Sequence, residues 1–189
     1  MFDFSREVFI CKCATDVAAT DDGALRFRDA GERDLSRLES GESLDDLRAR
    51  LARGERWLVG EAGGEIVTYT WLITGARFEY TYLPGCAFQL RADTGYGYGA
   101  FTVEKWRGRG FRRRAFVAEL RLLRALGKTW EAGVFIKPQL DGATRSLARV
   151  GIAVVPLWRV VYTRQRTLAA ERLCDDDCVT PLFEYAPLS

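Results

Sequence analysis

Two hydrophobic periods alternate along the chain, and this alternation constrains its fold more than any other feature. A period near 3.6 marks helices, whereas strict alternation or short β-branched and aromatic runs mark strands. The first pattern predicts helices at about 31–39, 43–54, 111–126 and 139–150. The second predicts strands at 7–14, 25–28, 56–61, 65–74, 96–103, 130–136 and 154–163, with 179–185 as a candidate last strand. Interleaved helices and strands predict an α+β (α/β) fold around one mixed sheet.

Residues 75–95 fit neither period. Aromatic clusters there are broken by Pro84-Gly85 and by Gly95, which are turn signals. We expect irregular structure or an additional hairpin in this stretch.

The longest helical pattern covers 111–126. Its apolar residues recur at steps of three and four, which predicts one stripe facing the core. Gly127 then provides a natural helix stop. The predicted stripe consists of Phe111, Ala115, Ala118, Leu122 and Leu126.

The chain length of 189 residues suits one domain, because domains usually run about 100–200 residues. The sequence contains no repeat and no linker-like tract, so we expect a single domain over 1–189. It also lacks the roughly 18 uninterrupted apolar residues of a membrane helix and the basic-then-apolar order of a signal peptide. We therefore expect a cytoplasmic protein without a membrane partner.

The sequence contains no histidine. Ser-His-Asp and Cys-His catalysis are excluded, because both need imidazole to accept the proton of the nucleophile. Zinc sites with a histidine ligand are excluded too, because the sequence has no imidazole to bind the metal. Any general base must be Glu, Asp, Tyr, Cys, Lys or a water molecule that they hold.

The five cysteines leave one alternative open. Cys11, Cys13, Cys174 and Cys178 would make a four-thiolate zinc site if the two ends of the chain met. Their spacings differ from the common Cys-x-x-Cys knuckle. We therefore expect no metal.

The stretch 101–112 joins a predicted strand to the longest predicted helix. Backbone N–H groups at a helix N-terminus, together with the helix dipole, bind phosphate oxygens. Gly108 and Gly110 allow the backbone to approach such an anion without a Cβ in the way. Nearby arginines add charged donors: Arg107, Arg109, Arg112, Arg113 and Arg114. The stretch predicts a pyrophosphate site, and the alternative is a solvated basic turn.

The same basic run also permits a nucleic-acid site. Six of the ten residues 105–114 are Lys or Arg, and Trp106 and Phe111 stand among them. Basic side chains bind backbone phosphates, and aromatic rings stack on bases. The formal net charge of only +2 makes a nucleic-acid partner the less favoured hypothesis.

Residues 102–110 and the helix after them resemble motif A of the GNAT superfamily of acyl-CoA-dependent N-acyltransferases. The loop pattern of that family is Arg/Gln-x-x-Gly-x-Gly/Ala; Arg107 matches its first position and Gly110 its fourth. The resemblance covers about 25–163, and its other parts are 25–35, 56–74 and 143–152.

This resemblance implies a bent, mixed sheet whose central strands, 96–103 and 130–136, splay apart, with an extra N-terminal strand. It implies acetyl-CoA or another acyl-CoA as co-substrate, without a metal, and direct attack of an amine on the thioester. A backbone N–H near Phe101–Val103 would then bind the thioester carbonyl. The cofactor-binding residues that it implies are Phe101, Thr102, Val103, Arg107, Gly108, Arg109, Gly110, Phe111 and Arg112.

The sequence departs from the family pattern at several positions. Arg112 stands where Gly or Ala is usual, and it either narrows the phosphate turn or adds a guanidinium to it. Leu140 and Leu147 stand where many members have Asn and Tyr, and that Tyr is the proposed acid for the thiolate. The family's usual Glu base has no clear counterpart, and its place falls near Tyr96.

The candidate acid–base residues follow from these departures. Tyr96 and Tyr98 are two apart, so they share one strand face, and either is a candidate proton relay. Glu104 follows the strand and is a candidate base acting through water. Glu131 and Tyr162 are secondary candidates. For each tyrosine, aromatic packing is the competing interpretation.

The sequence leaves the acceptor open: a small-molecule or a peptide amine suits the chemistry. It also leaves open acyl-chain length, a carrier protein as donor, and a homodimer. A degenerate domain that binds acyl-CoA or a partner without catalysis is the main alternative, because Tyr is missing and the glycine loop is altered.

Overall fold

A computed structural model describes residues 6–18, 23–37, 42–75, 77–79, 86–163 and 167–183. Its strands are β1 (Arg6–Ala14), β2 (Arg26–Ala30), β3 (Arg56–Ala62), β4 (Glu65–Ile73), β5 (Arg77–Glu79), β6 (Cys86–Leu90), β7 (Thr94–Thr102), β8 (Trp130–Ile136), β9 (Val155–Tyr162), β10 (Thr167–Arg172) and β11 (Val179–Phe183). Its helices are α1 (Leu44–Ala52), α2 (Phe111–Ala125) and α3 (Lys137–Ala148), with 3₁₀ turns η1 (Glu32–Arg37) and η2 (Glu104–Trp106). Among the described residues, no helix combines the length and apolar content that crossing a membrane requires.

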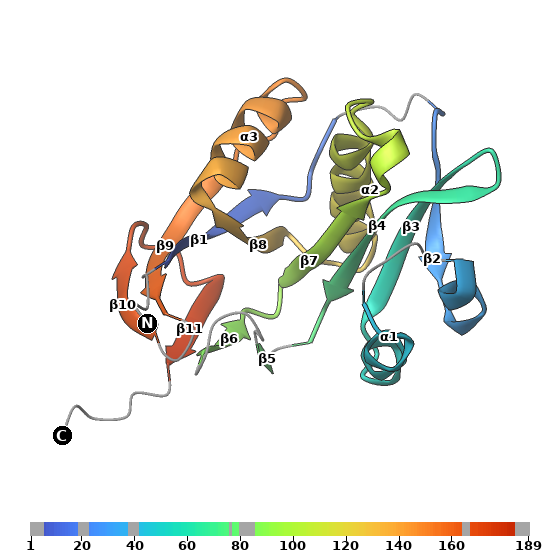
Figure 1. Ribbon diagram of the computed structural model, residues 1–189. Helices are drawn as coiled ribbons and strands as arrows, with labels where there is room; N and C mark the ends of the chain where they lie inside the picture. The colour runs from blue at the N-terminus through green and yellow to red at the C-terminus, as the bar shows by residue number, and fades with distance from the viewer. Residues whose placement is uncertain are drawn as a thin grey trace.

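The central sheet has eight strands in the order β10-β9-β1-β8-β7-β4-β3-β2 (Figure 1). β7 and β8 run parallel, and the other described neighbours run antiparallel. The parallel pairing joins Thr94–Tyr96 to Trp130–Ala132, and the two strands diverge beyond it. The predicted mixed sheet with two splayed central strands is confirmed.

The N-terminal strand lies inside this sheet. β1 pairs antiparallel with β8 on one side, where Val8 lies opposite Ile136. On its other side it pairs antiparallel with β9, where Arg6 lies opposite Tyr162. The sequence predicted an extra strand there, but its insertion between two late strands was not predicted. As a result, β1 forms part of the wall beside the diverging strands.

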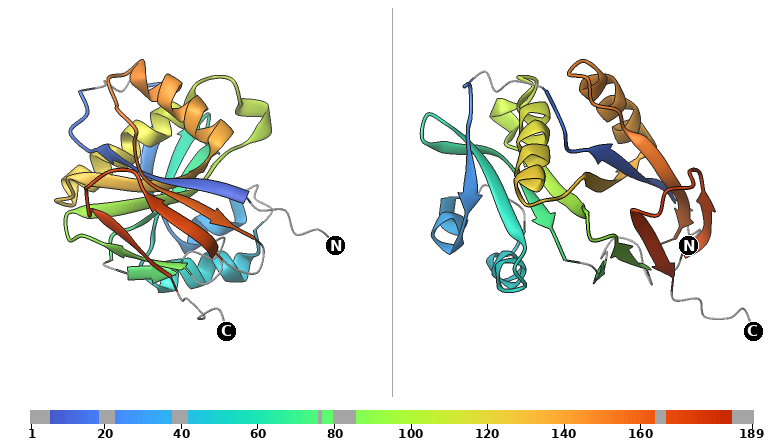
Figure 2. Two further views of the ribbon diagram at one scale, coloured as in Figure 1. Left: turned by 90° about the vertical axis from the view of Figure 1, so that its left-hand side faces the viewer. Right: turned by 180° about the vertical axis from the view of Figure 1, so that it is seen from behind.

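Helices α2 and α3 cover one face of the central sheet, and α1 covers the other (Figure 2). A second sheet, in the order β11-β6-β5, lies on the α1 side and packs Phe88 against Tyr96 and Leu157. The hairpin of β5 and β6 falls in the stretch 75–95 for which we expected irregular structure or a hairpin. β10 was not predicted.

The buried face of α2 differs from the predicted stripe. Phe111 and Ala115 are buried, but Ala118 and Leu122 are only partly buried and Leu126 is 39% exposed. The helix packs against the sheet, and its Phe116 shares a core cluster with Leu147 of α3, so it buries a face rotated away from the predicted one. The residues that fill this face are Phe116, Val117, Glu119, Leu120 and Leu123.

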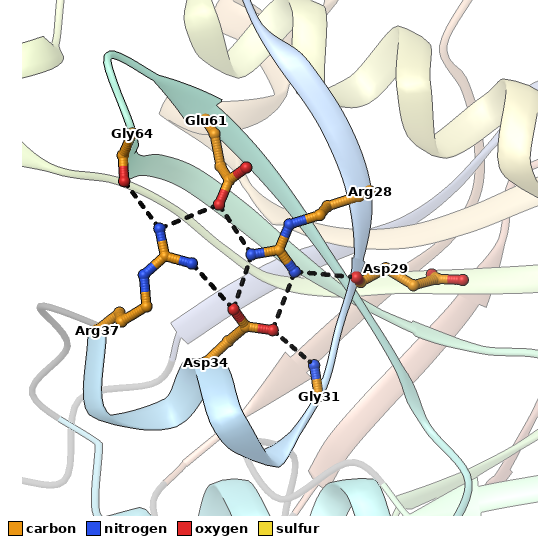
Figure 3. Close-up of polar contacts among 7 residues, drawn as sticks. All are labelled: Arg28, Asp29, Gly31, Asp34, Arg37, Glu61 and Gly64. Carbon is orange, nitrogen blue, oxygen red and sulfur yellow. Dashed lines mark hydrogen bonds and ion pairs between the residues drawn. The ribbon is translucent and has the colours of Figure 1, made fainter.

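A charged cluster ties η1 to the β3–β4 hairpin (Figure 3). The guanidinium of Arg28 donates to both carboxylate oxygens of Asp34, at 2.9 and 2.7 Å, and to Glu61 at 2.8 Å. Arg37 donates to Asp34, Glu61 and the carbonyl of Gly64. We call Arg28, Asp34, Arg37 and Glu61 the Asp34 cluster; it balances two cations against two carboxylates.

Candidate active site

A cavity of about 810 Å³ lies where β7 and β8 diverge. Its walls come from β1, β7, β8, α2, α3 and the loop between β7 and α2. Gly97 and Glu131 line it from the α2 side of the sheet, and Tyr98 and Val134 line it from the opposite side. The cavity therefore passes between the strands from one face of the sheet to the other.

The backbone of the diverging strands forms much of this wall. Beyond Tyr96 and Ala132, the inner edges of β7 and β8 face the cavity instead of each other. Such edges present N–H and C=O groups that are available to an extended ligand. Residues Gly99 and Ala100 together oppose Thr70, so β7 contains a bulge. A bulge bends the strand and re-aims its peptide groups.

The loop at the open end of the cavity has the predicted anion-binding geometry. Gly108 and Gly110 have positive φ angles of 78° and 74°, which side chains other than glycine adopt poorly. Gly110 is the N-cap of α2, a helix of 15 residues without an acidic residue in its first turn. A Cβ at Gly108 would meet no atom within 4 Å, so the loop surface is open.

Most arginines of the basic run stack on aromatic rings of the same chain. This arrangement gives no support to the nucleic-acid hypothesis, because the rings already have cationic partners, and Trp106 and Phe111 also pack together at 5.8 Å. The guanidinium carbons of Arg107, Arg109 and Arg114 lie 5.7, 4.7 and 5.5 Å from the ring centres of Phe101, Trp106 and Phe111.

Arg112 stands where the family's glycine-loop pattern has Gly or Ala, and its side chain extends along α2 towards Glu119. Its Nη1 lies 2.6 Å from Oε1 of Glu119, and its guanidinium passes over the ring of Phe116. Glu119 is fully buried, whereas the Arg112 side chain is 41% exposed. The guanidinium therefore pairs with a buried carboxylate, and it does not fold back over Gly110.

Glu119 and Glu131 form a buried carboxyl pair beside Gly97, at the closed end of the cavity where β7 and β8 begin to pair, and of the two only Glu131 lines the cavity. A Cβ built on Gly97 would lie 2.3 Å from Oε1 of Glu131 and 3.1 Å from Oε2 of Glu119. Both carboxyl groups thus press on the same glycine of β7, just where β7 and β8 cease to pair. We call Arg112, Glu119 and Glu131 the Glu131 cluster.

The environment of Glu131 disfavours its charge. Burial in a region of low polarity, the negative charge of Glu119 and a hydrogen bond with Glu119 raise the pKa of Glu131 well above its ordinary value of 4.5. Arg112 opposes this shift to a smaller extent. Glu131 therefore holds a proton under conditions where an exposed glutamate has lost it.

The two tyrosine candidates lie on the face opposite α2. Tyr96 is 1% exposed, packs on Phe88 at 6.0 Å, and is not among the cavity-lining residues. Tyr98 does line the cavity, and its hydroxyl donates to Glu55. Burial, followed by the Glu55 contact, raises the pKa of Tyr98, so its phenol is a donor and not a base. A catalytic role for Tyr96 or Tyr98 stays a prediction.

The remaining predicted residues divide between the cavity wall and its surroundings. Glu104 is exposed on η2 and does not line the cavity. Val103 is buried behind it, and Arg109 also lies off the wall. The predicted cofactor residues that do line the cavity are Phe101, Thr102, Arg107, Gly108, Gly110, Phe111 and Arg112.

The cysteines do not converge. Cys11 and Cys13 line the cavity from β1, whereas Cys174 and Cys178 pack in the core on the other face of the sheet. The described residues contain no group of three or more potential metal ligands. Burial raises the pKa of Cys11 to about 12, so this thiol is not a thiolate at neutral pH.

Sequence reasoning missed Glu119 altogether and ranked Glu131 low. The signal was present, because Glu119 lies four residues after Ala115 and four before Leu123, within an apolar helix face. A carboxylate in such a face is rarely fully buried unless it has a partner, so Glu119 predicts a buried polar contact.

Comparison with known proteins shows the fold. No protein-family model and no curated protein sequence matches the chain. Among solved structures, an acetyltransferase from the GNAT family of Colwellia psychrerythraea has a TM-score of 0.57 at 13% identity, over 85% of this chain and 56% of its own. A GCN5-related N-acetyltransferase from Sphaerobacter thermophilus has a TM-score of 0.57 at 17% identity, over 86% and 53%.

A functionally unknown conserved protein from Staphylococcus epidermidis has a TM-score of 0.54 at 9% identity, over 87% of this chain and 63% of its own. The chain thus spans between 53% and 63% of the length of these three structures. The protein has the fold of the GNAT acetyltransferases, as the sequence predicted.

Proposed function

We propose that the protein transfers an acyl group, with acetyl the first candidate, from a coenzyme A thioester to an amine. One observation supports this above all: the cavity between β7 and β8 is lined both by the open glycine loop at the start of α2 and by the buried carboxyl group of Glu131. A candidate anion site and a candidate acid–base group thus line one cavity. The GNAT-like fold agrees with this assignment.

The glycine loop suits the diphosphate of coenzyme A. The first N–H groups of α2 have no acceptor within the helix, and they point towards the loop. With the dipole of a helix of 15 residues, they favour a bound anion. Arg113 lines the same end of the cavity and supplies a charged donor.

The inner edges of β7 and β8 suit the rest of the donor. Coenzyme A supplies an activated acyl group at the end of an extended arm that contains two amides. Strand edges bind such a chain through alternating N–H and C=O groups. The bulge at Gly99 and Ala100 re-aims peptide groups of β7, and we propose that its N–H groups bind the thioester carbonyl together with the predicted donors near Phe101–Val103.

The acceptor amine then approaches from the opposite face of the sheet. The cavity reaches that face beside Tyr98 and Val134. The hydroxyl of Tyr98 donates to Glu55, which also pairs with Arg53, and the guanidinium of Arg50 lies over the Tyr98 ring, so this rim is polar and carries charges of both signs. A polar acceptor suits such a rim, whether its amine belongs to a small molecule or to a peptide.

Calorimetric titration of coenzyme A tests donor binding. Gly110→Val should weaken binding by more than tenfold, because a β-branched side chain blocks the loop and strains a residue with φ of 74°. Arg113→Ala should weaken it by about tenfold or less.

Gly127→Val is the matched control. It imposes the same strain at a φ of 77°, but at the far end of α2, and it should leave binding unchanged. If Gly110→Val binds coenzyme A as well as the parent protein does, the phosphate-loop assignment is wrong. If the protein binds an oligonucleotide, and if Arg113→Ala weakens that binding more than Gly110→Val does, the result supports the nucleic-acid hypothesis instead.

Release of free thiol from acetyl-CoA in the presence of a panel of small amines and lysine peptides tests transfer. Thiol release that depends on one amine supports the enzyme. Coenzyme A binding without amine-dependent release would support the degenerate, binding-only alternative.

A further inference from the structure

The Glu131 cluster is not needed to hold the fold together. Two buried carboxyls with one cation stabilise a protein less than apolar residues of similar volume would. Oε2 of Glu119 and Oε2 of Glu131 are buried, and no N–H or O–H group outside the pair donates to either oxygen. Buried polar atoms without partners are rare, so each calls for an explanation.

A single shared proton resolves this arrangement. Two carboxylates are acceptors only and cannot bond to each other, whereas one carboxylic acid donates to one carboxylate. The charge count agrees, because Arg112 balances one of the two carboxyls. From β1, Cys11 and Cys13 face the pair, and both are neutral because burial raises the pKa of each thiol.

The other nearby cation belongs to a different site. Lys12 of β1 pairs with Asp176 and lies over the ring of Trp130. Since residues alternate between faces along a strand, Lys12 points away from the face that holds Cys11 and Cys13. The cluster therefore has one cation for two carboxyls.

The position of the pair relates it to the donor and not to the acceptor. Glu119 lies eight residues after Phe111, which places it about 12 Å along the helix axis from the glycine loop. The donor arm leads from that loop towards the closed end, on the α2 side of the sheet. The acceptor rim at Tyr98 lies on the other side.

The reaction needs a proton at that place. When the amine attacks, the carbon–sulfur bond breaks, and the sulfur leaves as a thiolate unless a proton is supplied. Leu147, on the cavity wall of α3, has no proton to give. Glu131 lines the same cavity, and its burial beside Glu119 favours the acid form.

We propose that Glu131 protonates the leaving sulfur of the thioester, and that Glu119, held by Arg112, positions Glu131 and returns it to the acid form. This step rests on the proposed function. The O–H bond of Glu131 breaks as the S–H bond forms, and the attacking nitrogen loses one proton as its bond to carbon forms. That proton restores Glu131 through water, so atoms and charge balance over one turnover.

The first test measures the proton itself and needs no activity. In protein labelled with ¹³C at the glutamate carboxyls, one resonance should stay in the acid form at pH 7 and disappear in Glu131→Gln. In Glu119→Gln the Glu131 resonance should titrate at lower pH, because the neighbouring charge is gone. If every carboxyl is ionised at pH 7, the proposal is overturned.

The second test measures transfer with the amine that releases thiol from acetyl-CoA. Glu131→Gln should lower kcat by about 10²–10⁴-fold and leave the Kd for coenzyme A unchanged. The parent kcat should fall on the alkaline side as Glu131 loses its proton, and Glu119→Gln should move that fall to lower pH. Glu171→Gln, an exposed carboxyl on β10, is the control and should change neither.

The outcomes separate the two claims. An active Glu131→Gln enzyme overturns the acid role while the proposed function stands. A parent protein that neither binds coenzyme A nor transfers an acyl group overturns the proposed function, and the acid role with it, even if the carboxyl resonance shows the shared proton.

Discussion

The Asp34 cluster and the Glu131 cluster are both buried groups of opposite charges, but they are built differently. In the Asp34 cluster, two arginines face two carboxylates, and Asp34 also accepts from the backbone N–H of Gly31 at 3.1 Å. In the Glu131 cluster, one arginine faces two carboxyls, and no group outside the pair donates to two of the carboxyl oxygens. No residue of the first cluster lines the cavity, whereas Arg112 and Glu131 of the second cluster do.

This difference separates a structural role from a chemical one. The polar groups of the Asp34 cluster have hydrogen-bond partners, and such a cluster holds the chain in one conformation. It also gives up no proton near neutral pH, because the contact with Arg28 holds the pKa of Asp34 well below its usual range. In the Glu131 cluster, one arginine faces two buried carboxyls, and this arrangement favours the acid form of Glu131. The same residue types therefore tie a turn in one region and form the proposed acid in the other.

Breaking the Asp34 cluster should have the largest effect on stability. Arg28→Ala leaves Asp34 buried beside Arg37 alone, and it should lower the free energy of unfolding by about 3–5 kcal/mol. Arg33→Ala, an exposed arginine of the same 3₁₀ turn, should change it by less than about 0.5 kcal/mol. Urea unfolding measures both, and coenzyme A affinity should be the same in the two variants. An equal loss in the two variants would mean that the cluster does not tie the turn.

Adding one methyl group beside the Glu131 cluster should have an intermediate effect. Gly97→Ala brings a Cβ within 2.3 Å of a Glu131 oxygen, so it should destabilise the protein by about 1–3 kcal/mol. Removing the carboxyl in Gly97→Ala/Glu131→Ala should recover most of that loss relative to Glu131→Ala. Thermal unfolding of the four proteins gives the coupling energy, and strict additivity would show that the two groups do not touch.

The dependence of stability on pH should show the smallest effect and the clearest contrast. The pKa of Glu131 is raised in the folded state, so its contribution is present below pH 4.5 and is lost as the pH rises towards the folded value. The pKa of Asp34 is lowered, so its contribution is present above pH 3.8 and is lost as the pH falls.

Glu131→Gln should therefore gain stability over the parent as the pH rises from about 5 to 8, by on the order of 1 kcal/mol. Asp34→Asn should lose least at the lowest pH. Chemical unfolding at a series of pH values checks both signs. Two parallel curves would contradict the contrast between the clusters.

Much of this fold could be predicted, because local patterns decide it. The period of the hydrophobic residues located α2 and β8, and the glycines at 108 and 110 located the helix start. The glycine loop of the candidate site was also found this way, since loop, helix and charge are contiguous in sequence.

The carboxyl pair could not be found in the same way. Glu119 and Glu131 meet only because β7 diverges from β8 and presents a glycine to α2. The rotated face of α2 and the place of β1 likewise depend on which partner each element meets. No local period contains that information.

The position of β1 has a consequence for how the protein is made. Its register joins Val8 to Ile136 and to Val160, so its two partners follow more than a hundred residues later. Such distant pairings slow folding, because the chain loses the entropy of closing a long loop before the stabilising contacts between the strands form. During synthesis the strand that carries Cys11 and Cys13 leaves the ribosome long before either neighbour exists. The inner wall of the cavity is therefore among the last parts to assemble, and an interrupted chain would lack it.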